Sequence, residues 1–364
     1  MTATIQDVAR VAGVSVSTVS NVLNGRTDRM RSETLSRVKS AITTLEYRPS
    51  KLAQQLKTGH TPLLGLLVPS LTNPMYGHMA REIESYAQQK YEYRLLIGST
   101  YRDRTQEIAF IEDLLAHGVR RVIVISSLAD ERHLESAVER GMVVVSYDRG
   151  ATPGKRSRVS HVMPDNYAAA RLATSHLIAQ GHRRIAFVTV AGMTMSRSAK
   201  IDGFHAAADE AGLRDWAQIL DGGALDEYGD GVIAEVGRAT AHRIATMTDR
   251  PTGLVALNDL MAIGLIAGLR EVGLQVPHDV SVVGMDGIYL AGLSNPSLST
   301  VQLPVAEMMH AMVDRAMQAE APIDASSSDQ VLHSGRLVVR ESVAAPPVQQ
   351  RQAHLQISQE KTAS

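Results

Sequence analysis

The sequence predicts an α/β protein: a small N-terminal helix-turn-helix domain, a connecting helix, and a two-lobed core of parallel sheets. Three observations support this. Short helical patterns occupy residues 1–48. From Leu63 onward, uniformly apolar runs alternate with amphipathic segments, which is typical of parallel sheets covered by helices on both faces. The alternation continues for roughly 280 residues, too long for one open sheet, so we expect two lobes.

The N-terminal domain reads as three short helices. Thr4 and Asp7 predict a capping box at the start of the first helix, and Gly13 ends it. Ser15 and Ser32 are expected to cap the second and third helices. Two helices joined by a tight glycine turn form a helix-turn-helix.

The core elements follow from the apolar runs. We expect strands over 63–68, 93–98, 121–126, 142–147, 184–190, 252–257 and 280–286. We expect helices over 78–90, 104–117, 165–180, 198–211 and 259–271. The predicted core spans 61–343, with lobe one over 61–160 and 292–323 and lobe two over 161–291 and 324–343. The polar, Pro- and Gln-rich segment 344–364 is expected to be disordered.

Charge and composition narrow the class of protein. Residues 1–60 hold nine Lys/Arg and four acids, a net of +5, so the rest must carry −6 to give the total of −1. A basic head predicts a polyanionic partner. The chain has no cysteine, which excludes disulfides and thiolate metal sites. No signal segment or 18-residue apolar run is found, so we expect a cytoplasmic protein without a membrane partner.

The motifs, taken in order, resemble the lactose/galactose repressor (LacI/GalR) family. They are "TIQDVARVAGVSVSTVSNVLNG", "LEYRPSKLAQQLKTG", "GHRRIAFV", "NDLMAIGLIAGLREVGLQVPHDVSVVGMD" and "GRLVVRES". The resemblance runs from Thr4 to about Ser342. It implies a homodimeric repressor that binds a pseudo-palindromic operator in double-stranded DNA and responds to a small-molecule effector.

The resemblance implies that the helix over 15–24 lies in the major groove. Its short donor–acceptor side chains allow close approach to bases and phosphates, and an exposed valine can contact a thymine methyl. The predicted base-reading residues are Val16, Ser17 and Asn21. Asn21 stands where the family commonly has arginine, and asparagine favours adenine if it bonds bidentately. The predicted phosphate contacts are Thr18, Ser20, Arg26, Arg29 and Arg31. The alternative is an ordinary polar helix face around the core positions Val14, Val19, Val22 and Leu23.

Residues 49–60 predict a hinge helix too short to be stable alone in water. The resemblance implies that two such helices, one per subunit, pack in the minor groove, where Leu56 acts as a wedge that bends the DNA. The other predicted hinge residues are Ser50, Lys51, Leu52 and Ala53. The alternative is a flexible linker with incidental leucines.

Ligands of open parallel sheets bind beyond the carboxyl ends of the strands. Polar residues that follow the predicted strands are therefore candidate effector contacts: Asn73, Tyr76, Asp148, Asn258 and Asp286. Asp259 reads better as a helix cap. Carboxylates and amides in a cleft suit a polyol such as a sugar or sugar derivative. The resemblance adds Arg197 and Lys200, although the usual arginine position is held by Ser198, one residue later.

Two other classes of protein are weighed. An enzyme is disfavoured because no phosphate-binding loop, nucleophile elbow or paired metal-binding histidines appear, so we expect no catalytic residues, cofactor or metal. A solute-binding protein would share the core fold, but neither the basic head nor the missing signal segment suits it.

Overall fold

The computed structural model describes residues 3–23, 25–28, 30–47, 62–126, 128, 130–147, 158–191, 194–223, 230–318 and 332–347. The chain divides into two compact units, Met1–Thr61 and Pro62–Ser364. The predicted hinge over 49–60 lies outside the described residues, as does the predicted tail beyond residue 347.

The N-terminal unit contains α1 (Ile5–Ala12), α2 (Val16–Leu23) and α3 (Ser32–Thr44). The capping box of Thr4 and Asp7 is present, and Gly13 ends α1 with a left-handed φ of 62°. The hydroxyl oxygen of Ser15 accepts the N–H of Thr18 at 3.1 Å, which confirms its role at the start of α2. The prediction for Ser32 is wrong. The helix ladder of α3 already begins at the Arg31 carbonyl, so Ser32 is the first helical residue rather than the cap.

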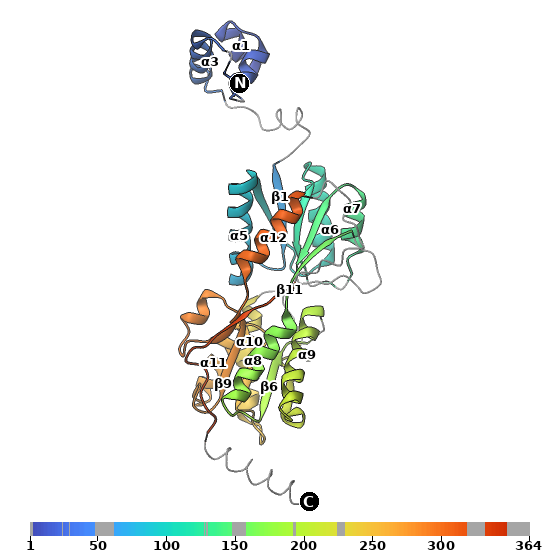
Figure 1. Cartoon of the computed structure of the whole chain (residues 1–364), viewed down its shortest axis with the longest axis vertical. Helices are drawn as coiled ribbons and strands as arrows, with labels where there is room; N and C mark the ends of the chain where they lie inside the picture. The colour runs from blue at the N-terminus through green and yellow to red at the C-terminus, as the bar shows by residue number, and fades with distance from the viewer. Residues whose placement is uncertain are drawn as a thin grey trace, which may run out of the picture. The chain divides into compact units, whose positions relative to one another are not determined.

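The larger unit holds two six-stranded sheets (Figure 1). The first has the order β11-β5-β4-β3-β1-β2. Its strands are β1 (Leu63–Val68), β2 (Arg94–Ser99), β3 (Arg121–Ile125), β4 (Val143–Tyr147), β5 (Ser160–Pro164) and β11 (Leu332–His333). The second has the order β12-β10-β9-β8-β6-β7. Its strands are β6 (Ile185–Thr189), β7 (Ala217–Asp221), β8 (Gly253–Ala256), β9 (Ser281–Asp286), β10 (Ser299–Gln302) and β12 (Arg336–Val338). All described pairings are parallel except β10 with β12. The predicted fold class and all seven predicted strands are confirmed.

Helices cover both faces of each sheet, as uniformly apolar strands require. Around the first sheet these are α5 (Pro74–Tyr91), α6 (Arg104–Ala116), α7 (Arg132–Glu139) and α12 (Val305–Gln318). Around the second they are α8 (Asn166–Ala179), α9 (Met195–Glu210), α10 (Asp230–Ala245) and α11 (Asp259–Glu271), with short 3₁₀ turns η1 (Arg214–Trp216) and η2 (Tyr289–Gly292). In β1, Leu66 faces the core that contains α5 and α12, and Leu67 faces the core of α6 and α7.

The strand pairings place the crossings between lobes differently from the prediction. Strand β5 extends the first sheet to Pro164. Strand β10 pairs with β9 in the second sheet, although the prediction places 292–323 in lobe one. Strand β11 pairs with β5 in the first sheet, although the prediction places 324–343 in lobe two. The chain therefore crosses after β5, between β10 and α12, and between β11 and β12. Strand β10 escapes prediction because it buries polar residues: Ser299 and Thr300 are fully buried.

The second lobe continues past the predicted boundary at Val343. The backbone carbonyl of Ala344 accepts hydrogen bonds from the hydroxyl of Ser281 at 3.1 Å and from Nε2 of His182 at 2.9 Å. Its N–H donates to the Ser281 hydroxyl at 3.0 Å. The core therefore extends at least through Ala344.

Helices α10 and α11 approach closely because glycines lie at their contact. A Cβ at Gly264 would lie 1.9 Å from the backbone oxygen of Ala234, and a Cβ at Gly237 would lie 2.3 Å from the backbone oxygen of Met261. No side chain fits at these distances. The contact thus depends on glycine at both positions.

Replacing Gly264 by alanine is therefore expected to lower the free energy of unfolding by about 1–3 kcal/mol, because the helices must separate. Gly77→Ala in α5 is the matched control. Apart from its chain neighbours and the backbone of its own helix, no atom lies within 4 Å of the added Cβ. There the higher helix propensity of alanine should raise stability by up to about 1 kcal/mol. Urea unfolding of the full chain measures both effects, and a Gly264→Ala protein as stable as the wild type would contradict the close contact.

Candidate nucleic-acid interface and ligand cleft

Helix α2 divides into a core side and an exposed side. Val19 is completely buried, and Val14, Val22 and Leu23 pack around the core of the N-terminal unit, as expected. The predicted base-reading residues lie on the other side: Val16 is 41% exposed, and Ser17 and Asn21 are also exposed. An apolar side chain is thus presented to solvent beside two short polar ones.

The predicted phosphate contacts have mixed environments. Arg26 and Arg31 are exposed, and Thr18 and Ser20 are half-buried. The Thr18 hydroxyl lies 2.9 Å from that of Ser15. Arg29 lies outside the described residues, as do the predicted hinge residues Ser50, Lys51, Leu52, Ala53 and Leu56.

A cleft in the larger unit is lined by side chains from both lobes. Six of the seven predicted effector residues line it: Asn73, Tyr76, Arg197, Lys200, Asn258 and Asp286. The seventh, Asp148, lies outside the described residues. The other lining residues are Met75, Met79, Arg102, Tyr147, Pro164, Asn166, Thr194, Ser196, Ile233, Leu257 and Leu303.

Helix N-termini meet at this cleft because each follows the carboxyl end of a parallel strand. Asn73 caps α5 by accepting the N–H of Met75 at 2.9 Å. Thr194 caps α9, and Asn258 caps α11 by accepting the N–H of Met261 at 3.0 Å. Helix α8 begins at Asn166, another lining residue. The cleft therefore receives the positive ends of four helix dipoles.

Arg197 lies at the cleft, as predicted. It is 7% exposed, and its Nη1 donates to the carbonyl of Ala191 at 2.9 Å. Burial lowers the pKa of Arg197, and the positive charge of Arg102 lowers it further. Lys200 donates from Nζ to the carbonyl of Leu257 at 3.1 Å.

Asp286 is held in an unusual backbone conformation, with a φ of 121°. L-residues rarely adopt this region, and such strain persists only where the surroundings enforce it. The next two N–H groups, of Gly287 and Ile288, both donate to Oδ2 of Asp259 at 2.8 Å. Oδ1 of Asp259 accepts the hydroxyl of Thr300 at 2.6 Å. Asp259 is therefore an internal anchor for the loop that carries Asp286. Its predicted role as a cap is wrong, because Asn258 caps the helix.

Sequence reasoning missed several cleft residues. Arg102 follows β2 and Asn166 follows β5, so the strand-end rule could have found Arg102, whereas β5 itself was not predicted. Tyr147 is the last residue of β4. Thr194 and Ser196 follow β6 within the first turn of α9 and its cap.

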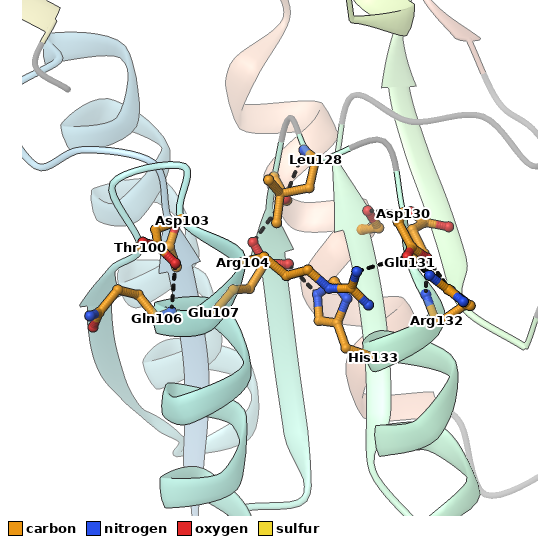
Figure 2. Close-up of polar contacts among 12 residues, drawn as sticks. Thr100, Asp103, Arg104, Gln106, Glu107, Leu128, Asp130, Glu131, Arg132 and His133 are labelled. Atoms are coloured by element: carbon orange, nitrogen blue, oxygen red, sulfur yellow. Dashed lines mark hydrogen bonds and ion pairs between the residues drawn. The ribbon is translucent and has the colours of Figure 1, made fainter. Parts of the chain in front are cut away.

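A second polar cluster lies at the carboxyl end of β3 (Figure 2). The carboxylate of Glu107, which is 1% exposed, contacts Nε2 of His133 at 2.7 Å and accepts the hydroxyl of Ser126 at 2.9 Å. Beside it, Arg104 pairs with Asp130 at 2.9 Å. These contacts join the starts of α6 and α7. None of the five is among the described residues that line the cleft.

The described residues show neither a metal site nor a membrane-spanning helix. Within them, no three His, Asp or Glu side chains are placed to hold a metal ion. None of the helices in this part of the chain combines the length and apolar composition that a membrane crossing requires.

Comparison with known proteins identifies the family. Residues 4–50 match the family described as bacterial regulatory proteins, lacI family, and residues 174–343 match a periplasmic binding protein-like domain. The chain is 32% identical over 320 residues to the HTH-type transcriptional regulator GalS of Salmonella typhimurium, covering 87% of this chain and 90% of that protein. The chain belongs to the lacI family. The transcriptional regulator GalR of Escherichia coli is 30% identical over 351 residues, 95% of this chain and 97% of GalR.

Solved structures of the lacI family agree on the fold. The lac repressor dimer bound to operator and the anti-inducer ONPF superimposes with a TM-score of 0.79 at 24% identity, covering 95% of this chain and 100% of that one. The regulator CelR in complex with cellobiose gives a TM-score of 0.63 at 25% identity, covering 93% and 99%. The predicted family and fold are confirmed, and the relatives named here are transcriptional regulators rather than enzymes.

The pKa of Asp259, the anchor residue of this lacI-family core, predicts how the stability of the protein depends on pH. Burial raises the pKa of Asp259 to about 6, against 3.8 for an ordinary aspartate. Between these values the folded protein holds a proton at Asp259 that the unfolded chain has released, so stability falls as pH rises through this window. Asparagine does not titrate. The unfolding free energy of the wild type minus that of Asp259→Asn should therefore decrease from about pH 4 to about pH 6 and then level off. Urea unfolding at a series of pH values measures it, and a flat difference would exclude the raised pKa.

Proposed function

We propose that the protein is a repressor that acts in the cytoplasm and binds a pseudo-palindromic operator as a homodimer under the control of a small polar effector. One observation carries the proposal: a single chain combines an exposed Val16–Ser17–Asn21 surface on a core-anchored helix with a cleft lined by six predicted effector residues. The alternative, a solute-binding protein, would need the cleft but not the exposed surface of Val16, Ser17 and Asn21.

On DNA, the exposed surface of α2 enters the major groove. Val16 contacts a thymine methyl, while Ser17 and Asn21 bond base edges. Arg26 and Arg31 are exposed and suited to neighbouring phosphates, with Arg29, Thr18 and Ser20 as further contacts. Twofold protein symmetry requires two half-sites. The dimer bound to operator in the lac repressor structure supports this arrangement.

The effector joins the two lobes by bonding residues of both. Asn73 and Tyr76 come from the first lobe; Asn258 and Asp286 come from the second. Closure then alters the packing of the hinge segment 49–60, which is stable only when held. Effector and DNA change each other's affinity by the same factor, typically about 5–150-fold. Cellobiose in the CelR complex supports a polyol ligand.

The proposal is tested by selecting bound sequences from random double-stranded DNA with the purified full chain. We expect an enriched inverted repeat, and affinity for it that changes when a cleft ligand is added. Failure to enrich any inverted repeat at low ionic strength would reject the DNA-binding function.

Asn21→Arg tests base reading. If Asn21 bonds adenine, the substitution should change the preferred base at one symmetric pair of positions toward guanine, with a discrimination of about 1–3 kcal/mol. Arg10→Gln is the control. The Arg10 side chain is exposed and pairs with Asp7 on α1. An unchanged consensus for Asn21→Arg would remove Asn21 from readout.

A further inference from the structure

The charged side chains of the cleft are unbalanced. Among the described residues that line it, three are cations (Arg102, Arg197 and Lys200) and one is a carboxylate, Asp286. A cleft for an uncharged sugar has no need of this excess.

The two arginines come from different lobes. Arg102 follows β2 of the first sheet, and Arg197 lies in the first turn of α9, which follows β6 of the second. Both line the cleft, and the charge of Arg102 lowers the pKa of the buried Arg197, while the carboxylate of Asp221 opposes this effect. Like charges repel strongly in partly buried surroundings. An anion between them would convert that repulsion into two charge-assisted contacts.

The backbone around Arg102 is held in a costly conformation. Tyr101 and Arg102 have φ angles of 50° and 59°, a left-handed region uncommon for residues other than glycine. The turn is fixed on both sides. The N–H of Thr100 donates to the carbonyl of Val68 at 2.9 Å, and the N–H of Asp103 donates to the carbonyl of Thr100 at 2.8 Å. No described carboxylate forms an ion pair with Arg102. Strain of this kind concentrates at binding sites.

The backbone adds positive potential of its own. Helices α5, α8, α9 and α11 all begin at the cleft, and each has at least fourteen residues except α11, which has thirteen. Each N-terminus is equivalent to about half a positive charge. The carboxylates of Asp165, which caps α8, and of Asp259, in the first turn of α11, offset part of this potential at those two helices. The uncharged polar side chains of the cleft can form hydrogen bonds with the hydroxyl groups of a ligand. They include Asn73, Asn166 and Ser196.

We propose that the effector is a hydroxylated anion, a sugar phosphate or a sugar acid, whose phosphate or carboxylate is held between Arg102 and Arg197 with Lys200 nearby. This rests on the proposed effector control. It adds that the ligand is charged and that Arg102, at the edge of the first lobe, selects it.

The test compares matched ligands on the full chain by calorimetry and thermal shift. Glucose, ribose and galactose are each paired with a phosphate (glucose 6-phosphate, ribose 5-phosphate, galactose 1-phosphate) and with an acid (gluconate, ribonate, galacturonate); inorganic phosphate is added alone. We expect at least one anion to bind at least about tenfold more tightly than its neutral parent, with an affinity that falls as salt rises. The series that shows this effect distinguishes phosphate from carboxylate.

Arg102→Gln should lower the affinity of the protein for the anionic ligand by roughly tenfold to a hundredfold. It should change the affinity for the neutral parent sugar by less than about twofold. Arg104→Gln is the matched control: Arg104 lies two residues further on and pairs with Asp130, so neither affinity should change. Arg102→Lys, which keeps the charge, should retain part of the preference. If the glutamine variant folds poorly, the lysine variant is used in its place to test the role of Arg102.

The outcomes separate the two proposals. A neutral sugar that binds as tightly as its anions and changes operator affinity would overturn the anionic ligand and leave effector control intact. An unchanged anion preference in Arg102→Gln would overturn the role of Arg102. Binding by no phosphorylated or acidic member would also reject the inference, whereas loss of operator binding itself would reject the proposed function.

Discussion

The parallel direction of the strands is the constraint on which the cleft depends. Because parallel strands end at one edge of a sheet, the helices that follow them begin there, and their unpaired N–H groups need acceptors. Short polar side chains supply them: Asn73, Thr194 and Asn258 each accept a backbone N–H at the first turn of a helix. These three capping residues also line the cleft. One local need of the fold creates the polar surface that a ligand meets.

A buried carboxylate sustains the most strained part of that surface. Asp259 is fully buried, yet it accepts three hydrogen bonds, two of them from the loop directly after Asp286. Burying the charged form of an aspartate costs free energy of desolvation, and the same burial raises the pKa of Asp259. The three hydrogen bonds offset part of this cost, and two of them hold the loop whose conformation L-residues rarely adopt. Stability and site geometry are therefore linked through one side chain.

The sequence predicted what periodicity and composition encode. Runs such as 63–68 and 280–286 are apolar throughout, so their strands and the edge at which they end could be foreseen, and Asn73, Asn258 and Asp286 followed from that edge. Strand β10 could not be foreseen because Ser299 and Thr300 are buried only by virtue of distant partners, Ser342 and Asp259. The end of β2 points to Arg102 as a candidate, but the conformation that brings it to the cleft is a left-handed turn that no residue type at positions 101 and 102 signals.

The crossing segments explain how a ligand in this cleft can act at a distance. Pro164 and Asn166 belong to the first crossing between the lobes and Leu303 to the second, and all three line the cleft. Any change in the angle between lobes must be absorbed by backbone rotation in the crossings. A ligand that contacts these crossing segments therefore acts directly on the backbone about which the lobes rotate. If it also lies between Arg102 of one lobe and Arg197 of the other, it replaces a repulsion across the cleft with attraction. Closure then gains free energy only when the ligand is present, which is the differential binding that a switch requires.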